Sequence, residues 1–170
     1  MKRLQPFALA LLLGLAAAPA LAQQFSAGDI TVENPWARAT PKGAPVGAAY
    51  LTIRNKGAVA DKLTGGSADF ATAVEVHEMN MKGGVMTMRP LTDGLAIPPN
   101  GSVTLAPSGY HLMFQGLKRQ LVRGETLRAT LTFEHAGALP VDFAVSGIGA
   151  MGPGSGKAPA ADPMKGMKMD

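Results

Sequence analysis

The chain has 170 residues, with 16 Lys and Arg against 12 Asp and Glu, which gives a formal net charge of +4. The basic residues are scattered along the chain rather than clustered, and this argues against a nucleic-acid or membrane-surface role. There is no cysteine, so the chain forms no disulfide and any metal site has to use other side chains.

Residues 1–22 are predicted to be a signal peptide. Lys2 and Arg3 provide a positive start, residues 7–18 form an apolar run, and Ala20-Leu21-Ala22 has the small residues of a cleavage site. The apolar run is too short for a helix that crosses a bilayer core of about 30 Å. We therefore expect export to the periplasm, cleavage after Ala22 and no stable membrane insertion.

Residues 23–148 are predicted to form a single all-β domain. Short segments with period-two alternation are separated by Gly and Pro turn signals, among them Gly65-Gly66 and Lys82-Gly83-Gly84. Only residues 68–73 suggest a helical turn. This spacing is typical of an antiparallel β-sandwich or barrel. The predicted strands cover 30–32, 49–53, 74–77, 85–88, 103–105, 111–114, 127–133 and 141–145.

Residues 149–170 are predicted to be a flexible, Met-rich tail. Gly, Pro, Ala, Met and Lys dominate this segment, and there is too little apolar bulk to offset the entropy of ordering it.

The scarce histidines lie close to methionines. His111-Leu112-Met113 places an imidazole and a thioether at i and i+2, which project from the same face of a strand. His77 precedes a predicted hairpin that turns at Lys82-Gly83-Gly84 and carries Met88 on its second strand. Antiparallel pairing can bring His77 and Met88 onto neighbouring strands. A pocket of soft donors would form if this hairpin met the strand of His111.

Thioether and imidazole donors without carboxylates suit Cu(I) far better than Mg, Ca or Mn. Zinc is disfavoured, because its usual protein ligands are Cys, His, Asp and Glu. Methionine also avoids the disulfide formation that threatens cysteine in an oxidising compartment. Neutral donors predict a moderate affinity, which a protein that releases its ion requires.

Other residues near this pattern receive plainer interpretations. Met86 is interpreted as core or rim packing, and Met79 and Met81 as exposed hairpin residues, although any of the three could act as an alternate ligand. Glu75 and Glu78 are interpreted as solvated. His135, between Glu134 and Ala136, is interpreted as a turn residue.

The spacing of these residues resembles the signature of the periplasmic copper chaperone family PCuAC. That signature is a His, ten residues, a Met, about twenty-one residues and then His-x-Met. Here ten residues separate His77 from Met88, and twenty-two separate Met88 from His111-Leu112-Met113. The extra residue falls near Pro98-Pro99-Asn100-Gly101, where a loop insertion is tolerated. Further likeness runs through residues 34–38, 49–51, 55–57, 61–63, 76–79, 88–90, 109–113 and 116–118.

The resemblance implies a cupredoxin-like antiparallel β-sandwich that binds Cu(I) through His77, Met88, His111 and Met113 at an exposed site. It also implies delivery of the ion toward the CuA centre of a haem-copper oxidase, cytochrome c oxidase, and additional copper on a C-terminal tail such as residues 149–170. The expected partners are the oxidase subunit that carries CuA and a Sco-type thioredoxin-fold protein. A carrier that docks transiently is expected to be a monomer. Trp36, Tyr50 and Asn55 are expected to have structural roles.

Other functions remain as alternatives. An electron-transfer copper protein needs a cysteine thiolate, which the chain lacks. No nucleophile elbow, paired histidine-carboxylate motif or phosphate loop indicates an enzyme. Two alternatives remain: a copper storage or detoxification protein, and a metal-free binding sandwich. Copper titration separates the metal-free sandwich from the copper carrier.

Overall fold

The computed structural model describes residues 23–154, so the predicted signal peptide and residues 155–170 lie outside the described part of the chain. Within residues 23–154 every regular element is a strand, which confirms the all-β prediction, and no helix there could cross a membrane. The strands are β1 (Gln24–Ala27), β2 (Ile30–Arg38), β3 (Val46–Asn55), β4 (Asp61–Ser67), β5 (Ala73–Lys82), β6 (Val85–Pro90), β7 (Leu95–Ile97), β8 (Ser102–Leu105), β9 (Tyr110–Gln115), β10 (Thr126–Phe133) and β11 (Gly137–Ser146).

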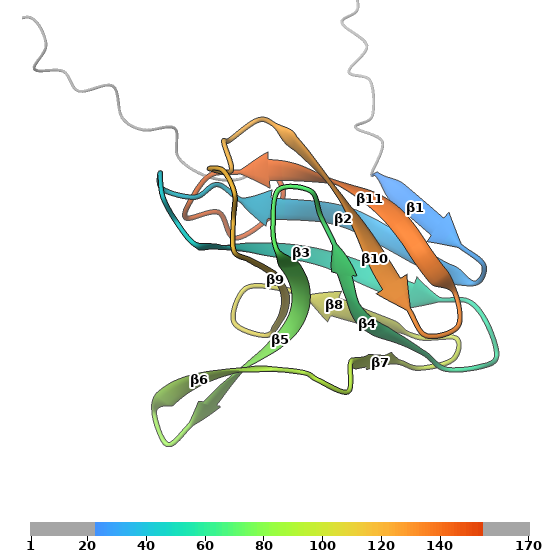
Figure 1. Cartoon of the computed structure of the whole chain (residues 1–170). Coiled ribbons are helices and arrows are strands. Elements are labelled where there is room, and N and C mark those ends of the chain that lie inside the picture. Colours follow the sequence, from blue (N-terminus) through green and yellow to red (C-terminus); the bar gives the residue numbers. More distant parts are fainter. Residues whose placement is uncertain (1–22, 155–170) are drawn as a thin grey trace, which may run out of the picture.

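The strands form a sandwich whose sheet closes on itself (Figure 1). Hydrogen bonding runs in the order β2, β11, β10, β4, β5, β9 and β3, and β3 then pairs with β2. All neighbours in this circuit are antiparallel except β11 and β2, which are parallel. The closure protects most of the strand edges and gives the domain one enclosed core.

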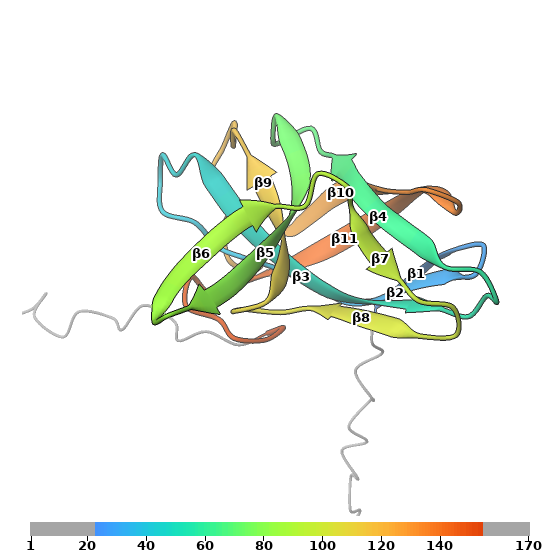
Figure 2. The ribbon, with the colours of Figure 1, turned by 90° about the horizontal axis from the view of Figure 1, so that it is seen from below.

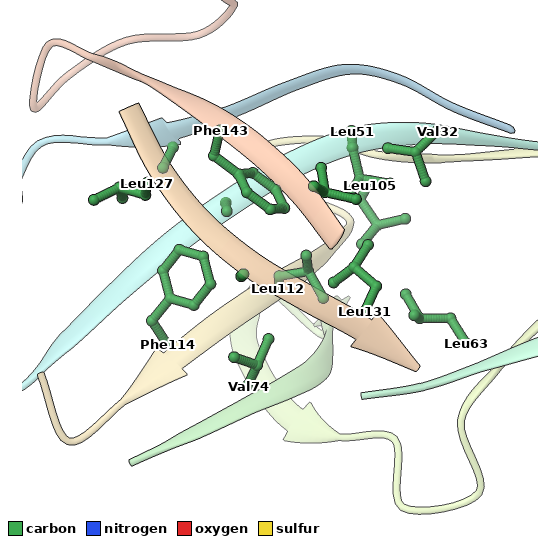
Figure 3. Packing of buried hydrophobic residues seen from close by; sticks show 14 of the residues in the cluster. Val32, Leu51, Leu63, Val74, Leu105, Leu112, Phe114, Leu127, Leu131 and Phe143 are labelled. Atoms are coloured by element: carbon green, nitrogen blue, oxygen red, sulfur yellow. The ribbon is translucent and has the colours of Figure 1, made fainter. Parts of the chain in front are cut away.

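Alternate residues of the strands point inward and fill the core. On β9, Leu112 and Phe114 point inward, whereas His111 and Met113 point to the outer face. Phe114 makes edge contacts with Phe70 and Phe143 at ring-centroid distances of 5.0 and 5.9 Å. Figure 3 shows Leu112, Phe114 and Phe143 directed toward one another between the two layers. This packing fixes β9, and thereby fixes the outward direction of its other two side chains.

Each predicted strand segment falls within an observed strand, but Gly65-Gly66 is not the turn that the sequence predicts. Both glycines lie in β4, where Gly66 pairs with Leu131 of β10. A Cβ atom on Gly66 would lie 2.3 Å from the backbone oxygen of Thr130. Here glycine permits close backbone approach rather than chain reversal. Strand β4 is therefore absent from the prediction. Strands β1 and β7 are absent as well, because they are short and lack clear alternation.

The hairpin of β5 and β6 turns through two residues, Gly83 and Gly84. Their φ angles of +60° and +79° suit the primed turns that match the twist of a hairpin. Figure 1 shows that this hairpin projects beyond the rest of the sandwich, and Figure 2 shows β6 at its outer side. The chain thereby carries a long two-stranded arm whose root belongs to the closed sheet.

Residues 149–154, with which the predicted tail begins, pack against the sandwich. Ala150 is buried beside Trp36 and Tyr50, whose rings lie 4.5 Å apart. Gly154 N donates a hydrogen bond to Ser146 Oγ at 2.9 Å. The small side chain of Ala150 fits against two large rings, so this part of the Gly- and Ala-rich segment is ordered by a contact that its composition does not reveal.

Candidate metal centre

The register of three strands brings the predicted ligands onto one outer face. His77 of β5 is the direct cross-strand partner of His111 of β9, and their ring centroids lie 5.8 Å apart. On the other side of β5, Met79 pairs with Met88 of β6. Because alternate residues of a strand share a face, His77, Met79 and Met88 project from the same side as His111.

Met113 joins this group from the second outward position of β9. It lies opposite Glu75 of β5 and Ala48 of β3. His77, His111 and Met113 are 7, 3 and 8% exposed, whereas Met88 is 48% exposed. The cluster therefore consists of three shielded donors and one that solvent reaches.

Hydrogen bonds assign the protons of both imidazoles. His77 Nε2 lies 2.8 Å from Glu75 Oε2, and a carboxylate can only accept, so Nε2 carries the hydrogen. His111 Nδ1 lies 3.2 Å from the carbonyl oxygen of Gly109 and donates to it by the same reasoning. The lone pairs of His77 Nδ1 and His111 Nε2 are then free.

These two nitrogens have no hydrogen-bond partner, and no other buried side-chain nitrogen or oxygen in residues 23–154 shares this condition. A buried polar atom without a partner costs about 1–3 kcal/mol. Metal ligands have this arrangement when the opposite ring nitrogen is held by a carboxylate or a carbonyl. Both imidazoles are therefore prepared to donate a lone pair to a cation.

A hollow of about 260 Å³ lies beside the cluster. His111, Met113, Arg38 and Tyr50 contribute to its lining, with the guanidinium carbon of Arg38 5.4 Å from the centre of the Tyr50 ring. The remaining sulfur atoms in the lining belong to Met79, Met86, Met88 and Met151.

Burial lowers the pKa of His111, and the nearby His77 and Arg38 lower it further, while the hydrogen bond to Gly109 opposes them. A lower pKa keeps the imidazole neutral, which is the form that binds metals. Among residues 23–154 no three side chains of the His, Cys, Asp and Glu types could together hold a metal ion. A third or fourth protein ligand beside the two histidines would therefore be a thioether, and thioethers favour a soft ion such as Cu(I).

The structure changes the interpretation of Glu75. Glu75 is not simply solvated, because it lies on the face of the two histidines, is bonded to His77, and lies 3.4 Å from Gln115 Nε2. Glu78 projects from the other face and forms an ion pair with Arg89 at 2.7 Å. The alternation along β5 separates the two carboxylates, and this period could have been read from the sequence.

Met86 is 58% exposed on the hairpin arm and lines the hollow, which agrees with rim packing and not with core packing. Met151, which the sequence places in the tail, lines the same hollow. His135 lies away from the cluster, where its Nδ1 is 3.4 Å from Asp61 Oδ1. Asn55 has the expected structural role, because its side chain bonds Gly57 N and the carbonyl of Val59.

Comparison with known proteins identifies relatives across most of the chain. A family model described as putative lipoprotein LpqE-like matches residues 30–145. The putative lipoprotein Lxx21020 of Leifsonia xyli subsp. xyli is 33% identical over 138 residues, which are 78% of this chain and 82% of the relative.

Solved structures also resemble this chain over about three quarters of its length. The copper-bound PCuAC domain of PmoF2 is 27% identical with a TM-score of 0.63, over 74% of this chain and 98% of that domain. The Cu(I) form of DR1885 from Deinococcus radiodurans is 32% identical with a TM-score of 0.56, over 76% and 83% of the two chains.

The fold and the relatives define the class of this protein. It is a cupredoxin-like β-sandwich with the fold of copper-binding chaperone domains. The chain belongs to the LpqE-like family, and its resemblance to the PCuAC copper chaperones is confirmed.

Proposed function

We propose that this protein carries one Cu(I) ion as cargo, bound by His77, Met88, His111 and Met113, and delivers it toward the CuA centre of a haem-copper oxidase. The observation that carries the proposal is the pair of buried, unpartnered nitrogens, His77 Nδ1 and His111 Nε2, on directly opposed residues. Two sulfur donors project from the same face, and the relatives include domains whose structures are described as copper-bound.

The donor set fits a carrier better than a permanent site. All four ligands are neutral, so the ion keeps its charge and its affinity stays below that of a thiolate cluster. Exposure of Met88 gives an acceptor's ligand a place to attack, while the three buried donors keep hold of the ion until exchange is complete. An ordered exchange of this kind releases no free ion.

The proposed location is the periplasm, after export and cleavage behind Ala22. The relatives described as lipoproteins support export. The proposed partners are the oxidase subunit that carries CuA and a Sco-type thioredoxin-fold protein, met transiently by a monomer. The mass of the protein isolated from the periplasm tests the cleavage site.

The decisive experiment measures transfer of Cu(I) from the loaded protein to a soluble CuA domain. Wild type should transfer about one equivalent, and His111→Ala should transfer none. Uptake of one equivalent without any transfer would contradict the delivery function and leave copper binding intact. Absence of stoichiometric uptake would leave a metal-free binding sandwich.

Storage or detoxification predicts a different stoichiometry. Removing residues 149–170 should leave one tight site in a carrier, whereas a store that depends on the tail would lose most of its capacity. A second truncation, which ends the chain after Gly154, keeps Met151. Comparing the copper capacity of the two truncated proteins separates the contribution of residues 149–154 from that of residues 155–170.

A further inference from the structure

Three methionines outside the proposed ligand set line the same hollow: Met79 of β5, Met86 of β6 and Met151, which follows β11. Met86 is 58% and Met151 68% exposed, so neither contributes much to the core. When long apolar side chains remain exposed around a single hollow, they indicate a functional surface.

The strand register directs the first two of these side chains. Met79 follows His77 at i+2 on β5 and therefore shares its face. Met79 pairs with Met88, and Met81 pairs with Met86, so Met79 and Met86 are diagonal neighbours. Diagonal Cα atoms lie about 7–8 Å apart, within reach of long side chains. Two thioethers can thus converge from the arm of the hairpin.

Met151 reaches the hollow from the segment that follows β11. Arg38 Nε donates a hydrogen bond to the carbonyl of Ala150 at 2.8 Å, and Arg38 Nη2 donates one to the Met151 sulfur at 3.3 Å, which an incoming cation would have to replace. Ala150 itself is 1% exposed, packed beside Trp36 and Tyr50. The backbone beneath Met151 is therefore anchored, and its sulfur is directed to the hollow although the side chain is solvent-accessible.

We propose that Met79, Met86 and Met151 form a second, weaker station for a soft monovalent cation, Cu(I) in the cell, at the mouth of the hollow. Three neutral thioethers select Cu(I) and exclude hard cations such as Mg²⁺ and Ca²⁺. Without an imidazole, this station holds the ion less tightly than the four-ligand centre. The station goes beyond the proposed function, which requires a single ion.

Met88 connects the two sites. It is the cross-strand partner of Met79 and belongs to the proposed ligand set of the inner centre. An ion can move between the sites by exchanging sulfur ligands around Met88, with no change in its charge or oxidation state. The outer station therefore serves as the point at which the ion enters and leaves.

The test follows each methionine separately in the full-length protein. Methyl-¹³C methionine is incorporated, Ag(I) is added as a redox-inert substitute for Cu(I), and Met164, Met167 and Met169 are changed to Leu throughout so that they do not compete. The first equivalent should shift Met88 and Met113. The second should shift Met79, Met86 and Met151 together and most strongly, whereas Met81, which pairs with Met86 but does not line the hollow, should shift much less.

The matched variants are Met79→Leu/Met86→Leu/Met151→Leu and, as control, Met81→Leu. Loss of coordinating thioethers should weaken the second equivalent by at least about tenfold in the triple variant, since even indirect ligand partners contribute 10–100-fold, and should leave the control unchanged. The proposal is overturned if the second equivalent survives in the triple variant, or if Met81 responds like the other three. Failure of the first equivalent to reach Met113 would instead contradict the inner centre, so the two proposals fail separately.

Discussion

His77 and His111 are direct partners across β5 and β9, and each keeps one buried ring nitrogen without a hydrogen-bond partner. Their other ring nitrogens are bonded to Glu75 and to the carbonyl of Gly109. Each imidazole is therefore held at one nitrogen and open at the other, which makes the pair the central part of the candidate metal centre.

Replacing His111 should separate metal affinity from stability. His111→Leu removes a ligand, and Cu(I) affinity should fall by more than the 10–100-fold typical of indirect partners. In the metal-free protein the same change removes an unpartnered polar atom together with the hydrogen bond from Nδ1 to the Gly109 carbonyl, which still accepts from Met79 N. The two effects oppose each other, so the free energy of unfolding should change by no more than about 1 kcal/mol. Competition with a chromophoric Cu(I) chelator and denaturant titration measure the two effects. His135→Leu, at an exposed turn, is the control and should leave affinity unchanged. A destabilised apo protein that still binds Cu(I) normally would contradict the assignment.

Glu75 is predicted to act by positioning His77. Glu75→Gln should reduce Cu(I) affinity by about 10–100-fold, the usual effect of losing the partner of a ligating histidine. Nitrogen-15 NMR of the imidazole should show that the fraction of His77 protonated at Nε2 decreases, a signature that a merely structural role would not produce. Glu78→Gln provides the control, because Glu78 lies on the other face and pairs with Arg89. Equal effects of the two substitutions would point to net charge rather than to position.

Met88 is predicted to control release. Since its side chain is 48% exposed, Met88→Leu should alter the free energy of unfolding by no more than about 0.5 kcal/mol. Loss of the outermost ligand should nevertheless speed dissociation of Cu(I) to an acceptor, measured by stopped-flow transfer. Met81→Leu changes the same residue type on the same arm and should leave the rate unaltered. An unchanged rate in Met88→Leu would remove Met88 from the ligand set.

Local sequence patterns predict the β-sandwich and the grouping of the His and Met side chains. The features that these patterns do not predict depend on contacts between residues far apart in the sequence. Period-two alternation placed His111 and Met113 on one face, and the glycines after Met81 predicted the hairpin that carries Met88. The contact of Glu75 with His77 depends on the facing strand, and Met151 depends on Ala150 packing against distant rings. No window of neighbouring residues contains those contacts.

Gly66 also depends on a contact that is distant in the sequence, because it packs against the backbone of β10. A methyl group at this position would meet the Thr130 carbonyl oxygen at 2.3 Å, so Gly66→Ala must displace β4 from β10. The expected loss in the free energy of unfolding is more than about 3 kcal/mol, typical of substitutions that disturb packed backbone. Gly149→Ala is the control, since a Cβ there meets no atom within 4 Å, and it should change stability by less than about 0.5 kcal/mol. A stable Gly66→Ala protein would contradict the close pairing.

Asp61, which does not belong to the candidate metal centre, should make stability depend on pH. Its buried carboxylate accepts backbone hydrogen bonds from Lys62, His135 and Ala136 at 2.7, 2.9 and 3.0 Å. Burial alone would raise the pKa of Asp61, but these bonds outweigh it and the pKa lies below its usual value. The folded state therefore binds the proton less tightly than the unfolded chain, whose Asp pKa is about 3.9.

This stabilisation is fully present above that unfolded value and is lost as the pH falls through the lower folded value. At neutral pH, Asp61→Asn should cost about 2–3 kcal/mol, because an amide cannot replace all three accepted bonds. The difference between wild type and Asp61→Asn should shrink steadily in urea titrations below about pH 4. A difference that stayed constant with pH would mean that the carboxylate contributes by its shape and not by its charge. Cu(I) affinity at pH 7 should be equal in both proteins, because none of the three donors to Asp61 belongs to the metal centre.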